Sequence, residues 1–158
     1  MTDQTSAAPA TGGDADVVDS PVGWVADHIR QYVESGGEQG HDWQGAPTLL
    51  LTTTGRRSGQ RRRNALIYGQ DGDRYLVVAS KGGAPEHPAW YLNLSDDPQV
   101  EVQVKDEVFG ASARTADDAE RARLWSTMVA IWPAYAQYQI KTDRQIPVVV
   151  LTPRGVTG

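Results

Sequence analysis

The chain has no cysteine, and only one phenylalanine, two methionines and three histidines occur among its 158 residues. The absence of cysteine excludes disulfides, thiolate catalysis, iron–sulfur clusters and cysteine-ligated zinc, and it suits a reducing compartment. His28, His41 and His87 lack the spacing of metal ligands, so we expect no metal site. No apolar run approaches the length of a membrane span, and the N-terminus lacks the basic and apolar regions of a secretory signal. We therefore expect a cytoplasmic protein.

Positive charge is scarce and unevenly placed. The net charge is −5 and the pI is about 5.1, which disfavours a general nucleic-acid-binding surface. Five of the twelve arginines nevertheless fall within residues 56–63, in a segment flanked by glycines. Glycine lets backbone N–H groups approach a ligand, and arginine binds phosphate or carboxylate bidentately. The segment predicts a site for a multiply charged anion, with a solvated basic turn as the alternative.

The length and the 39% hydrophobic composition predict one domain with a buried core. Residues 1–19 are rich in Ala, Thr, Gly and Asp, and we expect them to be disordered. Residues 20–36 predict an amphipathic helix that begins at Ser20 and Pro21. Its apolar face is expected to dock on the domain, with a partner subunit or a weak contact to the inner membrane surface as the alternatives. The folded domain is expected to span residues 46–155.

Short apolar or alternating segments separated by turn residues predict strands in that domain. The six predicted strands cover residues 48–54, 64–69, 74–80, 100–105, 108–114 and 146–152. A short helix is expected over residues 87–94, and a longer one is expected to start at Thr115 and to kink or end at Pro133. The pattern is mainly β with α: a small antiparallel barrel or curled sheet of about six strands, flanked by helices.

The usual signatures of catalysis are missing: the sequence has no nucleophile elbow, zinc-protease motif or lysine-bearing P-loop. If the protein is an enzyme, a bound cofactor therefore supplies the chemistry and the protein orients it. A candidate site for a phosphate or a polar ring edge is the strand end formed by residues 79–83, which offers a hydroxyl, an ammonium and two glycine N–H groups. A plain exit from the strand is the competing interpretation.

Two aromatic segments, residues 88–93 and 132–138, could flank a planar ring and keep water away from a hydride. Aromatic residues at helical spacing more often belong to a core. Tyr135 and Tyr138 are the exceptions that we favour, because they follow a proline and stand among small or polar residues.

Taken in order from Pro47 to Pro153, the chain resembles the deazaflavin-dependent nitroreductase family of actinobacteria. The resemblance rests on residues 52–60 (TTTGRRSGQ), 79–83 (ASKGG), 88–94 (PAWYLNL), 132–135 (WPAY) and 143–150 (DRQIPVVV). It implies a split β-barrel and the deazaflavin coenzyme F420, whose phosphate and poly-glutamate tail match the anion inferred from the arginines. It also implies hydride transfer from the reduced coenzyme to a quinone, an enone or a nitroaromatic compound.

By position, the resemblance implies coenzyme contacts in four segments and at one late tyrosine. The implied cofactor-binding residues are Arg56, Arg57, Ser58, Arg62, Arg63, Asn64, Ala65, Leu66, Ile67, Val78, Ala79, Ser80, Lys81, Ala89, Trp90, Tyr91, Leu92, Asn93 and Tyr135. The implied acceptor pocket is lined by Ile67, Trp132, Tyr135 and Tyr138, together with Ser80. The candidate catalytic residues are Tyr135 and Ser80. For Tyr135 we favour an orienting role, because a tyrosine with a pKa of about 10 is a poor acid.

The chain departs from the family pattern at three positions. Many relatives have proline where Arg61 stands, and the nitroimidazole-reducing members have tyrosine at the positions of Ile67 and Trp132. Two alternatives stay open: a non-catalytic carrier of the coenzyme, and a small barrel that binds nucleic acid through the arginines. The physiological acceptor, the proton donor and the oligomeric state are left open by the sequence.

Overall fold

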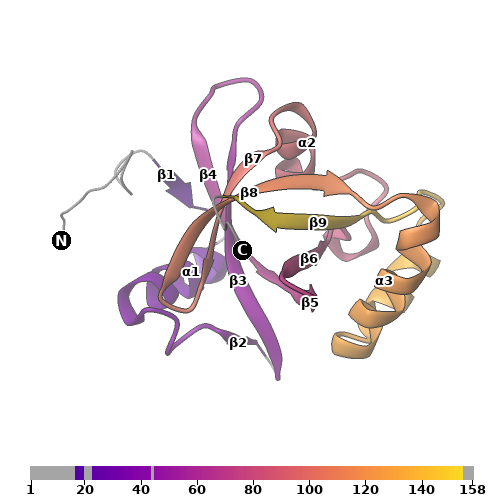
Figure 1. The fold of residues 1–158 in the computed structure, drawn as a ribbon, viewed down its shortest axis with the longest axis horizontal. Helices are drawn as coiled ribbons and strands as arrows, with labels where there is room; N and C mark the ends of the chain where they lie inside the picture. Colours follow the sequence, from indigo (N-terminus) through magenta and orange to yellow (C-terminus); the bar gives the residue numbers. More distant parts are fainter. Residues whose placement is uncertain (1–16, 20–22, 44, 155–158) are drawn as a thin grey trace.

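The computed structural model describes residues 17–19, 23–43 and 45–154 (Figure 1). This part of the chain contains a nine-stranded sheet in which every pairing is antiparallel except that of β1 with β4. The strands are β1 (Val17–Asp19), β2 (Asp42–Trp43), β3 (Ala46–Thr54), β4 (Arg61–Ile67), β5 (Gly69–Asp71), β6 (Arg74–Val78), β7 (Gln99–Val104), β8 (Glu107–Thr115) and β9 (Val148–Pro153).

Seven of the described strands form the wall of a barrel, and Tyr68 is the point of closure. The sheet order β4-β3-β7-β8-β9-β6-β5 ends on two strands that Tyr68 alone separates in the chain. β4 and β5 therefore act as one bent strand that pairs with β3 before the bend and with β6 after it. The Tyr68 backbone N–H donates to the Pro47 carbonyl at 3.0 Å, which extends the pairing with β3 into the bend. This circuit confirms the predicted fold class, a split β-barrel of about six strands with helices around it.

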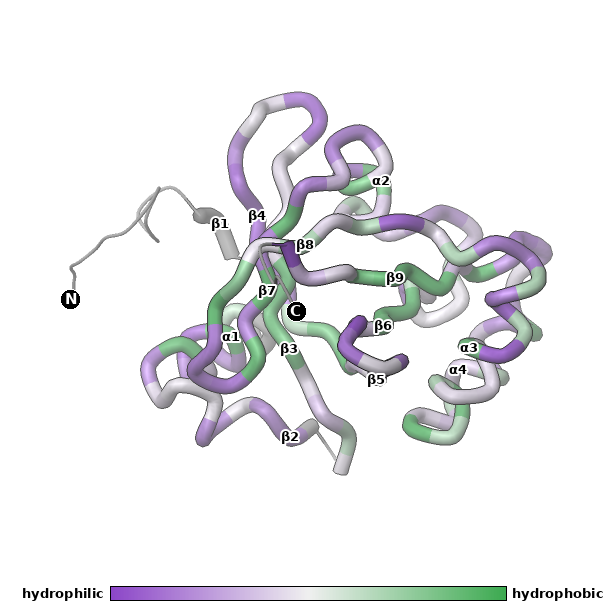
Figure 2. The backbone as a smooth tube through the Cα atoms, viewed as in Figure 1, coloured by the Kyte–Doolittle hydropathy of each residue, from purple (hydrophilic) through white to green (hydrophobic). Residues whose placement is uncertain are grey.

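Strand alternation divides the apolar side chains between the barrel interior and the helix-covered outside. Leu49 and Leu51 of β3 are buried in the interior, whereas Leu50 lies in a separate cluster under α1 (Gly23–Ser35). In the same way, Val77 faces the interior and Leu76 packs on the opposite side. Figure 2 shows the resulting apolar run along β9 and the hydrophilic loop that joins β3 to β4.

The helices cover three parts of the barrel. Trp90 and Leu94 of α2 (Ala89–Asp96) belong to the interior cluster. α3 (Asp118–Ile131) and α4 (Ala134–Ile140) pack on the outer face of β6 and β9. Pro133 separates α3 from α4, as predicted from its missing N–H. The predicted N-cap was wrong: Thr115 ends β8, and Asp117 caps α3 in a capping box with Glu120.

The N-terminal predictions fall partly outside the described residues. Residues 1–16, and the helix start at Ser20 and Pro21, are not described. The end of the segment predicted to be disordered, Val17–Asp19, instead forms β1. α1 docks on the barrel through Ile29 and Tyr32, both fully buried, as the default interpretation predicted. Within the described residues, none of the helices is both long and apolar enough to cross a membrane.

Candidate functional site

The arginine-rich segment forms a loop that closes on its own backbone; we call residues 55–60 the basic loop. The Gly55 N–H donates to the Gln60 carbonyl at 2.7 Å, and the Gly59 N–H donates to the Gly55 carbonyl at 2.8 Å. Gly59 has a φ of +73°, a conformation that favours glycine. These short-range bonds leave the side chains of Arg56, Arg57 and Ser58 exposed. The loop therefore presents cations and a hydroxyl to solvent on a fixed backbone.

Helix α2 holds this loop through a buried amide. Asn93 is 4% exposed, and its Oδ1 accepts a hydrogen bond from the Arg56 backbone N–H at 3.1 Å. Its Nδ2 donates to the Thr53 hydroxyl at 3.3 Å. Because both partners belong to the β3 end of the hairpin, Asn93 fixes the basic loop relative to the barrel. Asn93 was predicted to contact the coenzyme, and the structure places it directly beneath the loop backbone.

Strand alternation separates the three arginines of β4 onto different faces. Residues paired across antiparallel strands share a face, so Arg62 lies with Thr53, the partner of Asn93, whereas Arg61 lies with Thr54. A Cβ added to Gly55 would be 3.8 Å from the Arg62 Nε, which places that side chain beside the basic loop. Arg62 therefore joins the exposed cations of the loop, and Arg61 does not.

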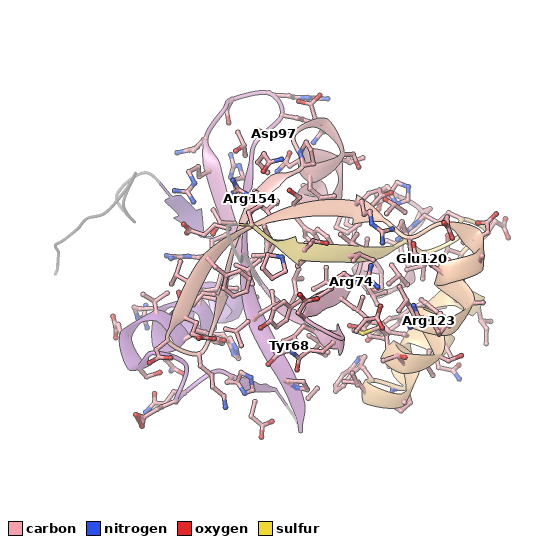
Figure 3. The ribbon with its side chains drawn as sticks, in the orientation of Figure 1. Tyr68, Arg74, Asp97, Glu120, Arg123 and Arg154 are labelled. Atoms are coloured by element: carbon pink, nitrogen blue, oxygen red, sulfur yellow. The ribbon has the colours of Figure 1, made fainter. Side chains whose placement is uncertain are left out.

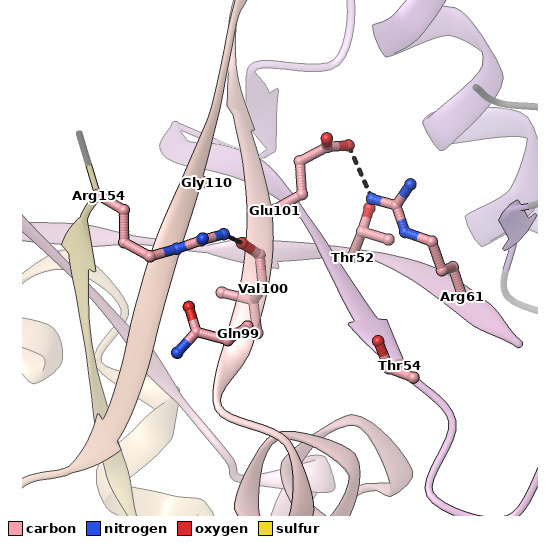
Figure 4. A pocket seen from close by; sticks show the side chains of 8 residues that line it. All are labelled: Thr52, Thr54, Arg61, Gln99, Val100, Glu101, Gly110 and Arg154. Atoms are coloured by element: carbon pink, nitrogen blue, oxygen red, sulfur yellow. Dashed lines mark hydrogen bonds and ion pairs between the residues drawn. The ribbon is translucent and has the colours of Figure 1, made fainter. Parts of the chain in front are cut away.

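Arg61 instead lines a pocket of about 150 Å³ on the outer face of the barrel (Figure 4). Its Nη2 lies 3.2 Å from the Glu101 carboxylate, and the Arg154 Nη2 donates to the Val100 carbonyl at 3.4 Å in the same pocket. The other lining residues are Thr52, Thr54, Gln99 and Gly110. Arg61 came from the segment predicted to bind an anion, but none of the residues implied to contact the coenzyme or the acceptor lines this pocket.

The second predicted segment forms a tight turn after β6. The 3-10 helix η2 (Lys81–Gly83) has a positive φ at all three residues: +47° at Lys81, +63° at Gly82 and +86° at Gly83. A Cβ on Gly83 would be 2.6 Å from the Tyr138 carbonyl oxygen, so the turn rests against α4 and requires glycine there. Ser80, 8% exposed, precedes this turn. The turn is therefore packed directly against the helix that carries Tyr135 and Tyr138.

The predicted contacts on either side of that turn have different surroundings. The side chains of Val78 and Ala79 are buried in the two cores, so only their backbone could meet a ligand. Lys81 is exposed and lies 3.3 Å from the Glu86 carboxylate. Trp90 of α2 is likewise a core residue, as the general preference of aromatics suggested. Tyr91 donates or accepts a hydrogen bond with the Thr115 hydroxyl at 2.8 Å.

The predicted coenzyme contacts on β4 also divide between two faces. Asn64 and Leu66 share the face of Arg62, whereas Arg63, Ala65 and Ile67 alternate onto the other. Leu66 packs against the interior cluster and Ala65 packs under α1. The structure therefore keeps these residues in one strand, but their side chains do not form a single lining.

The sequence analysis assigned no role to Arg144, whose side chain bonds to both ends of residues 79–84, which we call the Ser80 turn. Its side chain donates to the carbonyl oxygens of Ala79 at 3.2 Å, Ser80 at 2.8 Å and Ala84 at 2.9 Å. It also lies 3.1 Å from the Nδ1 of His87, whose pKa is lowered by burial and by this guanidinium. These partners are 57 to 65 residues away in the chain, so no local spacing could indicate them.

The four residues predicted to line the acceptor pocket gather in one apolar cluster. Tyr135 is 5% exposed at its centre, and Ile67, Trp132 and Tyr138 pack against it half-buried. The Tyr135 and Tyr138 rings meet nearly edge to face, with 6.1 Å between their centroids. Burial, and to a lesser degree Tyr138, raises the pKa of Tyr135 well above its usual value. The hydroxyl therefore stays protonated and is a weak acid.

The fold and these segments define a class: a split β-barrel protein with an exposed cationic loop and a separate cluster of aromatic and apolar side chains. The family model for F420H(2)-dependent quinone reductase matches residues 24–153. An F420H(2)-dependent quinone reductase of Mycobacterium tuberculosis is 46% identical over 131 residues, covering 80% of this chain and 88% of that protein. The chain therefore belongs to the F420H(2)-dependent quinone reductase family, oxidoreductases whose cofactor is coenzyme F420.

Solved structures agree with this assignment. One titled as an F420-H2-dependent reductase, FDR-A, is 44% identical, covers 66% of this chain and 93% of its own, and has a TM-score of 0.63. Another, titled as a domain-swapped dimer, is 39% identical, covers 84% of this chain and 99% of its own, and has a TM-score of 0.66. Both likenesses lie well within the range in which the fold is shared.

The residues present fit the cofactor. A phosphate and a chain of carboxylates need several cations on one accessible edge, and Arg56, Arg57 and Arg62 are exposed there without an ion pair to any described residue. A planar ring needs a close approach to backbone, and Gly82 leaves that approach open, because a Cβ there would meet nothing within 4 Å.

Proposed function

We propose that this chain transfers a hydride from reduced F420 to a quinone, with activated enones and nitroaromatic compounds as further acceptors. The observation that carries the proposal is the juxtaposition of the Ser80 turn with the aromatic cluster, because Gly83 touches the backbone of Tyr138. The turn therefore contacts the helix that carries the cluster expected to receive the acceptor.

In this proposal each segment has one task. Arg56, Arg57 and Arg62 bind the phosphate and the carboxylate tail, and Asn93 keeps their loop in place. The Ser80 turn meets the ring through its hydroxyl and backbone. Bound reduced F420 supplies the hydride, and the protein supplies position: orientation of two reactants accounts for roughly 7–11 kcal/mol of barrier reduction in favourable cases.

The acceptor is expected to stack against the cluster of Ile67, Trp132, Tyr135 and Tyr138. Apolar walls there exclude water from the transferring hydride. Tyr135 orients the acceptor by its ring and hydroxyl, and solvent provides the proton that completes the reduction, because the raised pKa of this tyrosine opposes proton donation. We expect quinones to be better acceptors than nitroimidazoles, since Ile67 and Trp132 stand where the nitroimidazole-reducing relatives have tyrosine.

The decisive experiment follows the deazaflavin absorbance band. Purified protein is mixed with reduced F420, and menadione, an activated enone and a nitroimidazole are offered in turn. Recovery of the oxidised band with menadione at a rate well above the protein-free reaction supports the proposal. A reduced coenzyme that binds but stays stable for hours beside every acceptor indicates the carrier alternative instead.

The location and the partners remain proposals. We propose the cytoplasm, with a small-molecule acceptor and no nucleic acid as partner. A contact between α1 and the inner membrane surface would have to use residues other than Ile29 and Tyr32, which are already buried on the barrel. Flotation with anionic vesicles tests that contact.

A further inference from the structure

One guanidinium group joins both ends of the loop that follows β6. The Nη1 of Arg144 donates to the Ala79 carbonyl, the Nη2 donates to the Ser80 carbonyl, and the Nε donates to the Ala84 carbonyl. The same Nη1 lies 3.1 Å from His87 Nδ1. Arginine has no acceptor, so His87 must accept this hydrogen bond as a neutral ring with its proton on Nε2.

The Ser80 turn depends on these hydrogen bonds from Arg144 because it has little regular structure of its own. Residues 81–83 all have positive φ, and only the bonds from Gly83 to Ser80 and from Ala84 to Lys81 close the turn. The planar fork of arginine reaches three differently directed carbonyls at once, which the single ammonium of lysine does not. Arg144 thus fixes where the Ser80 turn stands.

The backbone of Arg144 is tied to the other half of the site. Its carbonyl accepts a hydrogen bond from the Gln139 Nε2 at 2.8 Å, and the Gln139 Oε1 accepts from the Ile146 N–H at 2.9 Å. Gln139 belongs to α4, the helix that carries Tyr135 and Tyr138. One residue therefore links the Ser80 turn by its side chain to the aromatic helix by its main chain.

We propose that Arg144 is a positioning residue: it sets the spacing between the Ser80 turn and the aromatic cluster and contacts neither coenzyme nor acceptor itself. The inference rests on the proposed function, because it assumes that the coenzyme ring lies at that turn. Loss of the fork lets the turn move away from α4. The consequence is weaker coenzyme binding and poorer acceptor alignment in a protein that is still folded.

The test compares Arg144→Lys and Arg144→Ala with a matched control, Arg123→Lys. Arg123 lies on α3 (Figure 3) and donates two hydrogen bonds to Asp71, so this control removes another arginine fork outside the site. The measurements are the Kd for oxidised F420 by fluorescence, the kcat and KM for menadione, and the Tm. For both Arg144 variants we expect a Kd about tenfold or more above wild type and a lower kcat, whereas Arg123→Lys stays within about twofold.

A rescue experiment separates positioning from general destabilisation. Guanidinium ion at millimolar concentration should restore part of the F420 affinity of Arg144→Ala, and it should not help Arg144→Lys, whose side chain still fills the site. If Arg144→Ala does not fold, the Kd of Arg144→Lys decides. A folded Arg144→Lys with wild-type Kd and kcat, or one with a lower Tm but unchanged Kd, would overturn the inference. A wild-type protein that does not bind F420 would instead overturn the proposed function.

Discussion

The two loops that form the candidate site are held in opposite ways. The basic loop closes through backbone bonds between residues at most five apart, the Asn93 side chain ties it to α2, and its guanidinium groups are exposed. The loop after β6 is held by a guanidinium that points inward from a residue about 60 positions further on. In the first loop arginine is free to bind a ligand, and in the second arginine is part of the scaffold. Arginine side chains therefore have two roles in the candidate site, and the groups to which each guanidinium is bonded distinguish these roles.

This difference predicts how each loop responds to mutation. Removing charge from the basic loop should weaken ligand binding with little effect on folding, since the exposed side chains support no core. Changes around the loop after β6 should affect stability and binding together, because its bonds are internal. The following predictions test that separation.

The largest effect is expected from alanine at both Arg56 and Arg62. Two charge-assisted hydrogen bonds are worth about 1.5–3 kcal/mol each, so the Kd for F420 should rise about 100-fold or more while the Tm stays near wild type. The matched control is alanine at both Arg61 and Arg154, which removes the same charge from the outer pocket. Calorimetry at constant ionic strength measures both. A double variant with wild-type affinity, or a control that loses as much, would contradict the assignment of faces.

The contrast also shows what the sequence could and could not give. Strand alternation and turn residues predicted the barrel, because those signals are local. The cluster of arginines is also a local signal, and the anion site that it indicates stays a prediction. The bend at Tyr68 and the parallel strand β1 depend on pairing between distant segments, so no local pattern marked them. The role of Arg144 was not predicted for the same reason, because its partners are distant in the chain. Arg61 belongs to the cluster from which the anion site was predicted, and only the pairing register shows that it lies on the other face, beside Glu101.

Asn93→Ala tests the link between α2 and the basic loop. The change leaves the Arg56 N–H and the buried Thr53 hydroxyl without their partner, so unfolding free energy should fall by about 1–3 kcal/mol. The Kd for F420 should rise about tenfold, because the loop loses its tie to the helix. Urea unfolding and fluorescence titration measure the two. Ser95→Ala on the same helix is the control, and equal losses in both variants would argue against a specific role for Asn93.

A smaller, pH-dependent effect is expected at His87. Burial and Arg144 lower its pKa, so the folded protein prefers the neutral ring. The contribution of this neutral ring to the free energy of unfolding is fully present above the unfolded-state pKa of about 6.5. It is lost as the pH falls through that value toward the lower pKa of the folded state. Protonated His87 cannot accept the hydrogen bond from Arg144 that helps to hold the Ser80 turn. The affinity for F420 should therefore weaken a few-fold in acid, beyond any titration of the coenzyme itself.

His87→Gln keeps a hydrogen-bond acceptor that does not titrate, so it should flatten this acid loss. The control is His41→Gln, because the pKa of His41 is also lowered by burial but its partner is Tyr68, away from the loop after β6. The Kd is measured across the pH range for all three proteins. If the His41 variant removed the loss of F420 affinity in acid and the His87 variant kept it, the titrating group would lie outside the site.

The smallest effect is expected from Tyr135→Phe. Burial raises the pKa of this hydroxyl well above its usual value, so it remains protonated near neutral pH and releasing its proton is unfavourable. If the ring orients the acceptor and solvent supplies the proton, kcat should change by less than about threefold and the pH profile should keep its shape. Tyr135→Ala, which also removes the ring from the cluster, should raise the KM for menadione much more. A loss of about 100-fold in kcat for Tyr135→Phe alone would instead indicate that the hydroxyl donates a proton. The aromatic cluster would then take part in the reaction and would not only line the acceptor site.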